Sequence, residues 1–247
     1  MNEIIKSLHN RKSVRVFEDK DIPAEDKRLI FESALQAPSA GNMTLYTILD
    51  VTEQSLKDTL SVTCDNQPFI AKAPLVLVFC ADFHRWYEFF CRHCDEVRKP
   101  SLGDLQLATV DAVIAAHNCV VCAESLGIGS CYIGDISENF ERHRELFNLP
   151  SHVVPVCMLV FGYPTEQQKN REKPPRFKVE DIVFENAYDD SKAMNMDEMI
   201  ASRQSFGSFD ELHSWAEKFC ARKHNGEFSV EMSRSCKAAL DFFCGQG

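Results

Sequence analysis

The sequence has 247 residues, of which 45% are apolar and 26% charged, as is ordinary for a globular protein. Its formal net charge of −10 argues against nucleic acid as a partner, because phosphate contacts need a surplus of lysine and arginine. The apolar stretches 75–81 and 153–161 are too short to span a bilayer, so we expect no membrane partner. The N-terminus does not resemble a signal peptide, which makes a cytoplasmic location the expectation.

Hydrophobic periodicity and turn residues predict a succession of short helices and strands. We expect helices over about residues 4–10, 24–37, 53–61, 83–98, 102–126, 138–147, 209–223 and 230–243, and strands over 45–52, 75–81, 130–133 and 153–161. The unbroken apolar run at 75–81 suits a central strand that is covered on both faces. The helix over 102–126 is apolar around much of its circumference, which predicts a place in the core or at a subunit interface. It is expected to end at Gly127.

These elements predict an α+β fold in a single domain over residues 1–247. From about residue 189 the chain becomes more polar, and we interpret 189–247 as a C-terminal helical extension.

The chain contains 11 cysteines, and many stand inside apolar runs, where cysteine behaves as a small hydrophobic residue. Cys91 with Cys94, and Cys119 with Cys122, form two C-x-x-C units. Such pairs occur in zinc sites and in redox chemistry. The second pair lies in an apolar helix and neither is followed by typical zinc-knuckle residues, so we favour a structural role and expect no metal.

The basic run at residues 11–15 is a candidate phosphate site. In an extended segment Arg11, Ser13 and Arg15 share one face, and Lys12 adds another cation. A solvated basic turn is the alternative reading of this run by itself. The same alternative applies to a second basic segment, in which prolines stiffen the chain between Lys173 and Arg176.

Two further segments suit contact with a planar ligand. In the loop over residues 37–43, small residues let the backbone approach closely, and Ser39 and Asn42 offer hydrogen-bonding groups. In the segment over residues 126–135, Gly134 follows a strand and exposes backbone N–H groups that can stabilise negative charge. An ordinary helix-ending loop is the alternative for residues 37–43. In residues 126–135 the first glycines close a helix, and the segment matches neither the phosphate-loop nor the dinucleotide-binding pattern.

Together these segments resemble the nitroreductase superfamily, and within it the branch of NADPH-dependent nitroreductases and flavin reductases with an extended C-terminus. The matching pieces keep the family's order from about residue 2 to residue 188: residues 11–17, 37–42, 65–67, 79–83, 123–129, 132–134, 173–176 and 185–188.

The resemblance implies a nitroreductase-like fold with a mostly antiparallel mixed sheet, flanked by helices, in an intertwined homodimer that binds flavin mononucleotide (FMN). It also implies roles for particular side chains. Arg11, Lys12, Ser13 and Arg15 would hold the phosphate and ribityl chain, with Lys173 and Arg176 on the same phosphate, and Ser39 and Asn42 would come from the partner. Gln67 would reach the ring or the ribityl chain, Tyr132 would contact the cofactor, and Ile133 and Gly134 would place backbone N–H groups near the ring.

Two departures from the family pattern lie near these residues. Thr44 stands where relatives often carry Gln, and Asp135 stands where close relatives often carry a second Gly. We expect the Asp135 carboxylate to point away from the flavin, because its charge would disfavour a reduced ring. The basic loop also carries an extra proline.

The function implied by the resemblance is ping-pong two-electron transfer, in which NADPH or NADH reduces FMN and a small electrophile such as a nitro compound, quinone or flavin is then reduced. FMN would carry the chemistry, with no catalytic side chain. Arg203, Arg222 and Lys223 are candidates for the NADPH 2′-phosphate, although exposed helix charges are the favoured interpretation of these residues. The alternative function is a flavin- or metal-binding regulatory module without significant turnover.

Overall fold

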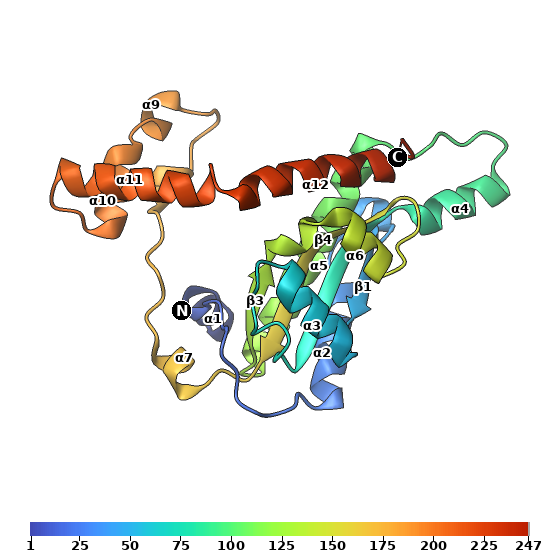
Figure 1. Cartoon of the computed structure of the whole chain (residues 1–247), viewed down its shortest axis with the longest axis horizontal. Helices are drawn as coiled ribbons and strands as arrows, with labels where there is room; N and C mark the ends of the chain where they lie inside the picture. The colour runs from blue at the N-terminus through green and yellow to red at the C-terminus, as the bar shows by residue number, and fades with distance from the viewer. Residues whose placement is uncertain (247) are drawn as a thin grey trace. The chain divides into compact units, whose positions relative to one another are not determined.

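The computed structural model describes residues 1–246 and contains four strands, twelve α-helices and two short 3-10 helices in that range (Figure 1). The order is α1 (Glu3–Asn10), α2 (Ala24–Leu35), η1 (Ala40–Asn42), β1 (Tyr46–Asp50), α3 (Gln54–Thr63), β2 (Leu75–Asp82), α4 (His84–His93), α5 (Leu102–Ser125), β3 (Gly129–Ile133), η2 (Gly134–Ser137), α6 (Phe140–Leu146), β4 (Val153–Gly162), α7 (Glu166–Asn170), α8 (Val179–Ile182), α9 (Asp190–Ala193), α10 (Met196–Gln204), α11 (Phe209–Lys223) and α12 (Glu227–Phe243).

The chain divides into two compact units, where the sequence predicts one domain with an extension from about residue 189. The first unit comprises Met1–Arg171 and the C-terminal segment that begins at Glu231, and the second is Glu172–Val230. The last helix therefore returns to the first unit, which periodicity along the sequence does not reveal.

The strands form one sheet in the order β1-β2-β4-β3, and every pairing between these strands is antiparallel. The expected α+β class and the mostly antiparallel sheet are confirmed. The parallel element of the expected mixed sheet is limited to an isolated bridge between Ser13 and Ser130.

Both faces of the sheet are covered, as the apolar run in β2 predicts. Side chains alternate along β2, so that Leu75, Leu77 and Phe79 pack on the side of α2 and α5, while Val76 and Val78 pack on the side of α3 and η2. All eight residues of β2 are buried. The result is a sheet between two helical layers (Figure 1).

The long helix α5 is a core helix with one uncovered face. Alanines and a cysteine on its inner face are fully buried against α2 and the sheet. By length and composition α5 is also the one helix within residues 1–246 that would suffice to cross a membrane. The sequence analysis considered only the shorter apolar stretches at residues 75–81 and 153–161. Gly127 takes the left-handed conformation (φ 73°) just after α5, as expected.

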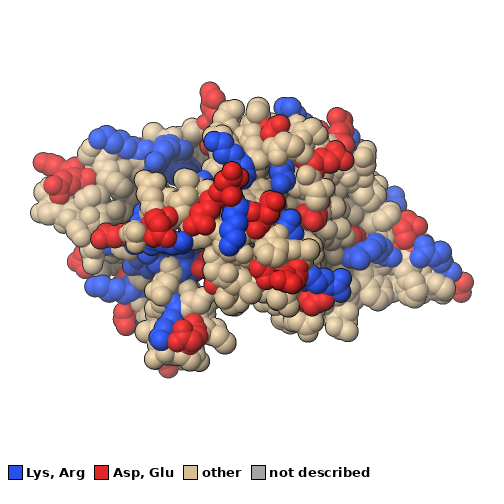
Figure 2. All heavy atoms as spheres, turned by 90° about the horizontal axis from the view of Figure 1, so that it is seen from below, with Lys and Arg blue, Asp and Glu red and all other residues tan. Residues whose placement is uncertain are grey.

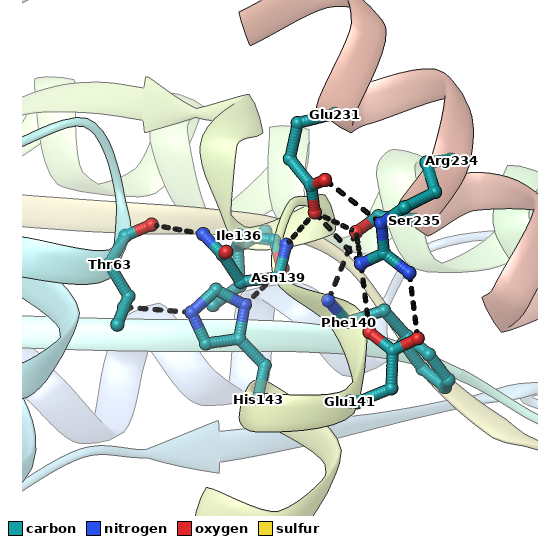
Figure 3. A network of polar contacts seen from close by, with 9 residues as sticks. All are labelled: Thr63, Ile136, Asn139, Phe140, Glu141, His143, Glu231, Arg234 and Ser235. Carbon is teal, nitrogen blue, oxygen red and sulfur yellow. Dashed lines mark hydrogen bonds and ion pairs between the residues drawn. The ribbon is translucent and has the colours of Figure 1, made fainter.

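A polar network fastens the C-terminal segment to α6 (Figure 3). The Arg234 guanidinium donates to both oxygens of Glu141, at 2.8 and 2.9 Å, and to both oxygens of Glu231, at 2.9 Å. Hydrogen bonds from Arg234 and Ser235 lower the pKa of Glu231 to about 2. Glu231 Oε1 in turn accepts from the backbone N–H of Asn139, at 3.2 Å.

The same network continues inward to the end of α3. The Asn139 side-chain amide donates to the carbonyl of Thr63, and His143 Nε2 lies 2.8 Å from Thr63 Oγ1. His143 is fully buried, and burial lowers the pKa of its imidazole. These contacts link α12, α6 and α3 on the face of the sheet that also carries η2 (Figure 3).

Charged side chains of both signs are interspersed on the surface. On the face shown in Figure 2, acidic and basic groups alternate rather than separate into one large basic tract.

Candidate functional site

The basic run lies along the free edge of β3. Ser13 bridges Ser130, and the backbone N–H of Val14 donates to the carbonyl of Ser130 at 2.9 Å. Gly129 makes this approach possible, because a Cβ there would lie 2.5 Å from a methyl carbon of Val14. Extended pairing against the sheet edge thus puts Ser13 and its flanking cations in fixed positions.

Three side chains of the run gather around Cys131 and Tyr132 of β3. Burial raises the pKa of the Cys131 thiol, while the charge of Arg15, a hydrogen bond with Ser13 and the charge of Arg11 lower it. The Arg11 guanidinium lies 5.9 Å from the ring centroid of Tyr132. Arg11, Ser13 and Arg15 therefore share one local environment, as the alternation predicts.

One atom in this environment points to a missing anionic partner. Arg11 Nε is buried and has no hydrogen-bond partner. An unsatisfied buried N–H on a charged guanidinium is costly, and an anion such as a phosphate would satisfy it.

The Lys12 side chain contacts another segment of the same chain rather than projecting into solvent. Its ammonium donates to the carbonyl of Lys169 at 2.7 Å and to that of Arg171. Arg171 itself donates from Nη2 to the carbonyl of Ser13 at 2.6 Å. The sequence analysis did not identify Arg171 as a site residue, and its position at the start of the basic, proline-containing segment is the signal that could have suggested it.

The end of β3 presents open backbone. Gly134 is exposed, and a Cβ at this position would have no neighbour within 4 Å. Ile133 before it is buried in the core. A flat ring can therefore approach the backbone here. The Tyr132 side chain instead packs against the α5 side of the core, and burial raises the pKa of its phenol.

Gln67 lies beside this open backbone. Its amide Nε2 donates to Asp135 Oδ2 at 3.1 Å and to the carbonyl of Cys64 at 2.8 Å. The Arg15 guanidinium lies 6.0 Å from the ring of Phe69, two residues further along. The Asp135 carboxylate thus accepts a hydrogen bond from Gln67, a residue predicted to reach the flavin. The expectation that Asp135 points away from the flavin stays a prediction.

Ser39 and Asn42 lie in a loop that a buried carboxylate holds. Asp111 of α5 accepts from the backbone N–H of Ala40 at 2.9 Å and from that of Leu45 at 3.2 Å. Ser39 Oγ accepts from the backbone N–H of Thr44. Gly41 and Asn42 both have φ of 57°, which a glycine and an asparagine tolerate best.

This loop and the basic run occupy opposite corners of the sheet. The loop leads into the start of β1, where Tyr46 pairs with Ala81 and Ala81 with Val154, whereas Ser130 pairs with Phe161. The β4 residues at these two places, Val154 and Phe161, are seven residues apart, which is about 23 Å along the strands. β1 and β3 are three strand spacings apart, which is about 14 Å across the sheet. That separation exceeds the length of an FMN molecule. The loop with Ser39 and Asn42 and the basic run of the same chain therefore cannot contact the same FMN.

Lys173 and Arg176 belong to the second unit. Arg176 Nη1 donates to the carbonyl of Pro174 at 3.1 Å. Their role on the phosphate stays a prediction. In the same unit Arg203 lies 4.1 Å above the ring of Phe177, beside a cavity of about 550 Å³. The cavity is lined mostly by aromatic and apolar side chains: Phe177, Met196, Ile200, Phe209, Leu212, Trp215, Ala216 and Phe219, with Asp197, Arg203 and His213.

The two C-x-x-C units differ in exposure. Cys91 and Cys94 are exposed at the end of α4, whereas Cys119 is buried in α5 and burial raises its pKa to about 12. All 11 cysteines are free thiols. Across residues 1–246, no group of three or more His, Cys, Asp or Glu side chains is arranged to hold a metal ion.

These residues suit FMN. The buried, unpartnered Arg11 Nε calls for an anion, with Ser13 and Arg15 beside it, and Gly134 leaves room for a planar ring. The residues suited to the phosphate and the residue suited to the ring thus both lie along β3.

Comparison with known proteins gives the same picture. The family model described as "Nitroreductase family" matches residues 8–163. An "FMN reductase (NADPH)" of Bacillus subtilis is 32% identical over 191 residues, covering 76% of this chain and 75% of the relative. An "Oxygen-insensitive NADPH nitroreductase" of Salmonella typhimurium is 31% identical over 204 residues, covering 81% and 82%.

Solved structures extend the likeness to nearly the whole chain. The NADPH:FMN oxidoreductase of Vibrio harveyi, determined in complex with NAD⁺, has a TM-score of 0.76 at 25% identity and covers 97% of this chain and 98% of that one. NfrA1 of B. megaterium has a TM-score of 0.83 at 26% identity, with coverage of 96% and 98%.

Proposed function

The chain belongs to the nitroreductase family, and we propose that it is an FMN-dependent oxidoreductase that uses NADPH or NADH to reduce a small electrophile. The observation that carries this proposal is the cluster of Arg11, Ser13 and Arg15 on the edge of β3, with a buried guanidinium N–H that has no partner. The relatives' names point to the same cofactor and the same electron donors.

Each part of the site has a separate task in this proposal. Arg11, Ser13 and Arg15 bind the phosphate. Lys12 and Arg171 connect the basic run to the segment that ends at Arg171 in the same chain. The backbone N–H groups of Ile133 and Gly134 lie near the ring and stabilise negative charge there. When bound, FMN supplies the chemistry of accepting and passing on a hydride.

The site is shared between two copies of the chain. Ser39 and Asn42 lie too far from the basic run to meet the same FMN within one chain, so they would serve the site of the partner. Asp111 keeps their loop in position for this purpose.

An uncovered apolar surface supports the homodimer. On α5, Leu107, Val110 and Val113 are 50%, 44% and 43% exposed and recur at helical spacing. On α1, which contacts α5, Ile4 and Leu8 are 65% and 45% exposed. Large exposed apolar side chains on two helices in contact are typical of a subunit interface.

The acceptor class is broad in this proposal: nitro compounds, quinones or flavins, reduced in a ping-pong cycle in the cytoplasm. Arg203, Arg222 and Lys223 are the candidates for the 2′-phosphate of NADPH. The Arg203 Nε is buried and without a hydrogen-bond partner, which favours Arg203 among the three.

The decisive experiment measures FMN binding and NADPH oxidation together. The purified chain should retain FMN, and NADPH should bleach the flavin absorbance. Replacement of Arg15 by alanine should weaken FMN binding about tenfold to a hundredfold, because one charge-assisted contact contributes about 1.5–3 kcal/mol. Arg28→Ala, which removes an exposed guanidinium paired with Glu32, is the matched control. Unchanged FMN binding by the Arg15 variant would contradict the phosphate assignment.

A further inference from the structure

Two of the exposed cysteines are close neighbours in sequence. The exposed thiols are those of Cys91, Cys94, Cys220 and Cys236, whereas the other cysteines are buried or half-buried. Cys91 and Cys94 form the first C-x-x-C unit, at the end of α4. The sequence predicts a structural role for both units, but a side chain in solvent contributes no packing to a core. The first unit therefore needs another explanation.

The end of α4 places these two cysteines within disulfide distance. The N–H of Cys94 donates to the carbonyl of Phe90 at 2.9 Å, which is the helical pattern. The Cα of Cys94 therefore still follows the helical path, about 5 Å from the Cα of Cys91. Disulfides join residues whose Cα atoms lie about 4.4–6.8 Å apart. Cys94 itself is extended (φ −127°, ψ 140°), so its side chain can adjust without breaking a helical turn.

Tyr87 distinguishes Cys91 from Cys94. Burial raises the pKa of the Tyr87 phenol, and so does its hydrogen bond with Cys91, one turn further along α4. The Tyr87 ring is held edge-on against His152, with the ring centroids 5.0 Å apart. The phenolic O–H can donate to the Cys91 sulfur, and a thiolate accepts such a bond better than a thiol does. Cys91 is therefore the better prepared of the two sulfurs to attack a disulfide.

The second C-x-x-C unit has the same spacing but lacks this access. Cys119 is fully buried in α5, its thiol donates to the carbonyl of Ile30 at 3.4 Å, and burial raises its pKa to about 12. Cys122 lies in the same uninterrupted helix. A thiol must be deprotonated and reachable to exchange with a disulfide. The second unit is thus an internal control for the first.

We propose that Cys91 and Cys94 form a reversible dithiol–disulfide site that exchanges with small disulfides such as oxidised glutathione. The Cys91 thiolate attacks one sulfur of the glutathione disulfide, whose S–S bond breaks; a mixed disulfide forms and one glutathione leaves. The Cys94 thiolate then attacks the Cys91 sulfur, which forms the Cys91–Cys94 bond and releases the second glutathione. The dithiol loses two electrons, the glutathione disulfide gains them, and the two thiol protons end on the two glutathiones. This step does not involve FMN.

Trypsin gives a direct readout of this bond. Arg92 lies between the two cysteines, so cleavage places Cys91 in the peptide 86–92 and Cys94 in the peptide 93–98. The full chain is equilibrated with oxidised glutathione, denatured in N-ethylmaleimide to block the remaining thiols, and digested. We expect the two peptides to be joined by a disulfide as their main form. Dithiothreitol added before the blocking step should separate them, because an exposed disulfide is readily reduced.

Three variants test the individual steps. Cys94→Ser removes the second thiol, so Cys91 should accumulate as the mixed disulfide with glutathione. Tyr87→Phe keeps the ring but removes the hydroxyl, and should slow the alkylation of Cys91 by iodoacetamide about threefold or more at neutral pH, with that of Cys94 unchanged. Cys220→Ser, which removes an exposed thiol that has no cysteine near it in sequence, is the matched control and should give the joined peptides in full.

Separate peptides from the unmodified chain, each carrying N-ethylmaleimide or glutathione, would overturn the inference. Equal linkage of Cys119 with Cys122 would overturn it as well, because oxidation would then not depend on access. An unchanged alkylation rate in Tyr87→Phe would contradict Cys91 as the attacking sulfur. All of these measurements can be made without flavin, so the proposed FMN function is tested separately.

Discussion

The guanidinium of Arg234 meets the carboxylate of Glu141 as a fork, with Nη1 and Nη2 donating to separate oxygens at 2.8 and 2.9 Å (Figure 3). Bidentate pairs of this kind have defined geometry as well as charge attraction. The pair joins α12 to α6, 93 residues apart in sequence. The last helix is thereby tied to the first unit by polar contacts in addition to the burial of Phe243.

Replacement of Arg234 by alanine should loosen this attachment. We expect the melting temperature to fall by about 2–4 °C and amide hydrogen exchange to accelerate in residues 231–243. Arg234→Lys should fall in between, because an ammonium cannot form the fork. Lys237→Ala, which removes an exposed pair with Asp241 on the same helix, should change neither quantity appreciably. Equal effects of the Arg234 and Lys237 variants would show that the fork does not anchor the helix.

Glu138 should make stability depend on pH. Burial, with the nearby charges of Asp135, Asp65 and Glu231, raises the pKa of its carboxyl to about 7, from 4.5. The folded state therefore favours the protonated form, and stability is lost as the pH rises from about 4.5 through 7. Glu138→Gln, which stays neutral, should raise the unfolding free energy by about 1–3 kcal/mol at pH 8 and hardly at all at pH 4.

The measurement is urea unfolding of both proteins across this pH range. The exposed Glu96→Gln serves as the control and should leave the pH dependence as it is. A constant difference between the Glu138 variant and the unmodified chain from pH 4 to pH 8 would contradict the raised pKa.

Gly129 should tolerate no side chain while Val14 is present. An alanine Cβ would lie 2.5 Å from Val14 Cγ2 and 2.9 Å from its Cβ, so the basic run must move away from β3. We expect Gly129→Ala to reduce stability by about 1–3 kcal/mol and to weaken FMN binding. Adding Val14→Ala should restore part of the FMN affinity. Gly103→Ala, for which a Cβ meets nothing within 4 Å, is the control.

Asp111 should influence a site that it does not touch. Its two oxygens hold the Ser39–Asn42 loop, and Asp111→Ala leaves two backbone N–H groups without their acceptor. We expect a loss of about 2–4 kcal/mol in stability and weaker FMN binding, with Asp111→Asn intermediate because it keeps one acceptor. Unfolding curves and FMN titration measure the two effects. Normal FMN affinity in Asp111→Ala would argue against a role for this loop in the site.

Local sequence patterns predicted the helices and strands well where capping or turn residues mark their ends. The helix over residues 209–223 has the bounds that the sequence indicates, and β2 differs by one residue because a polar Asp82 still pairs at its end. The helix after β2 was expected to reach residue 98 but ends at His93, since Cys94 adopts an extended conformation with no glycine or proline nearby to signal it. The helices α7, α8 and α9, of four or five residues each, carry too few residues to produce a clear period. The nine-residue α10 was not predicted either.

In the candidate site, contacts between sequence neighbours could be predicted, whereas long-range contacts could not. Arg11, Ser13 and Arg15 are neighbours in sequence, so alternation along an extended segment could bring them together in a prediction. The contacts of Gln67 with Asp135, and of Ala40 with Asp111, join residues 68 and 71 positions apart. No periodic pattern encodes such pairs, because the sheet order and the helix packing create them.

The apolar surface of α5 gives the last prediction, which concerns assembly. Val110 is 44% exposed at the centre of the stripe formed with Leu107 and Val113. An aspartate at position 110 would place a charge in the proposed interface, so Val110→Asp should shift the chain from dimer to monomer in sedimentation and should lower FMN retention in parallel. Val62→Asp, at a 57% exposed position on α3, is the control and should remain dimeric. A monomeric Val110 variant that keeps full FMN affinity would refute the shared site, because Ser39 and Asn42 cannot reach the basic run of their own chain.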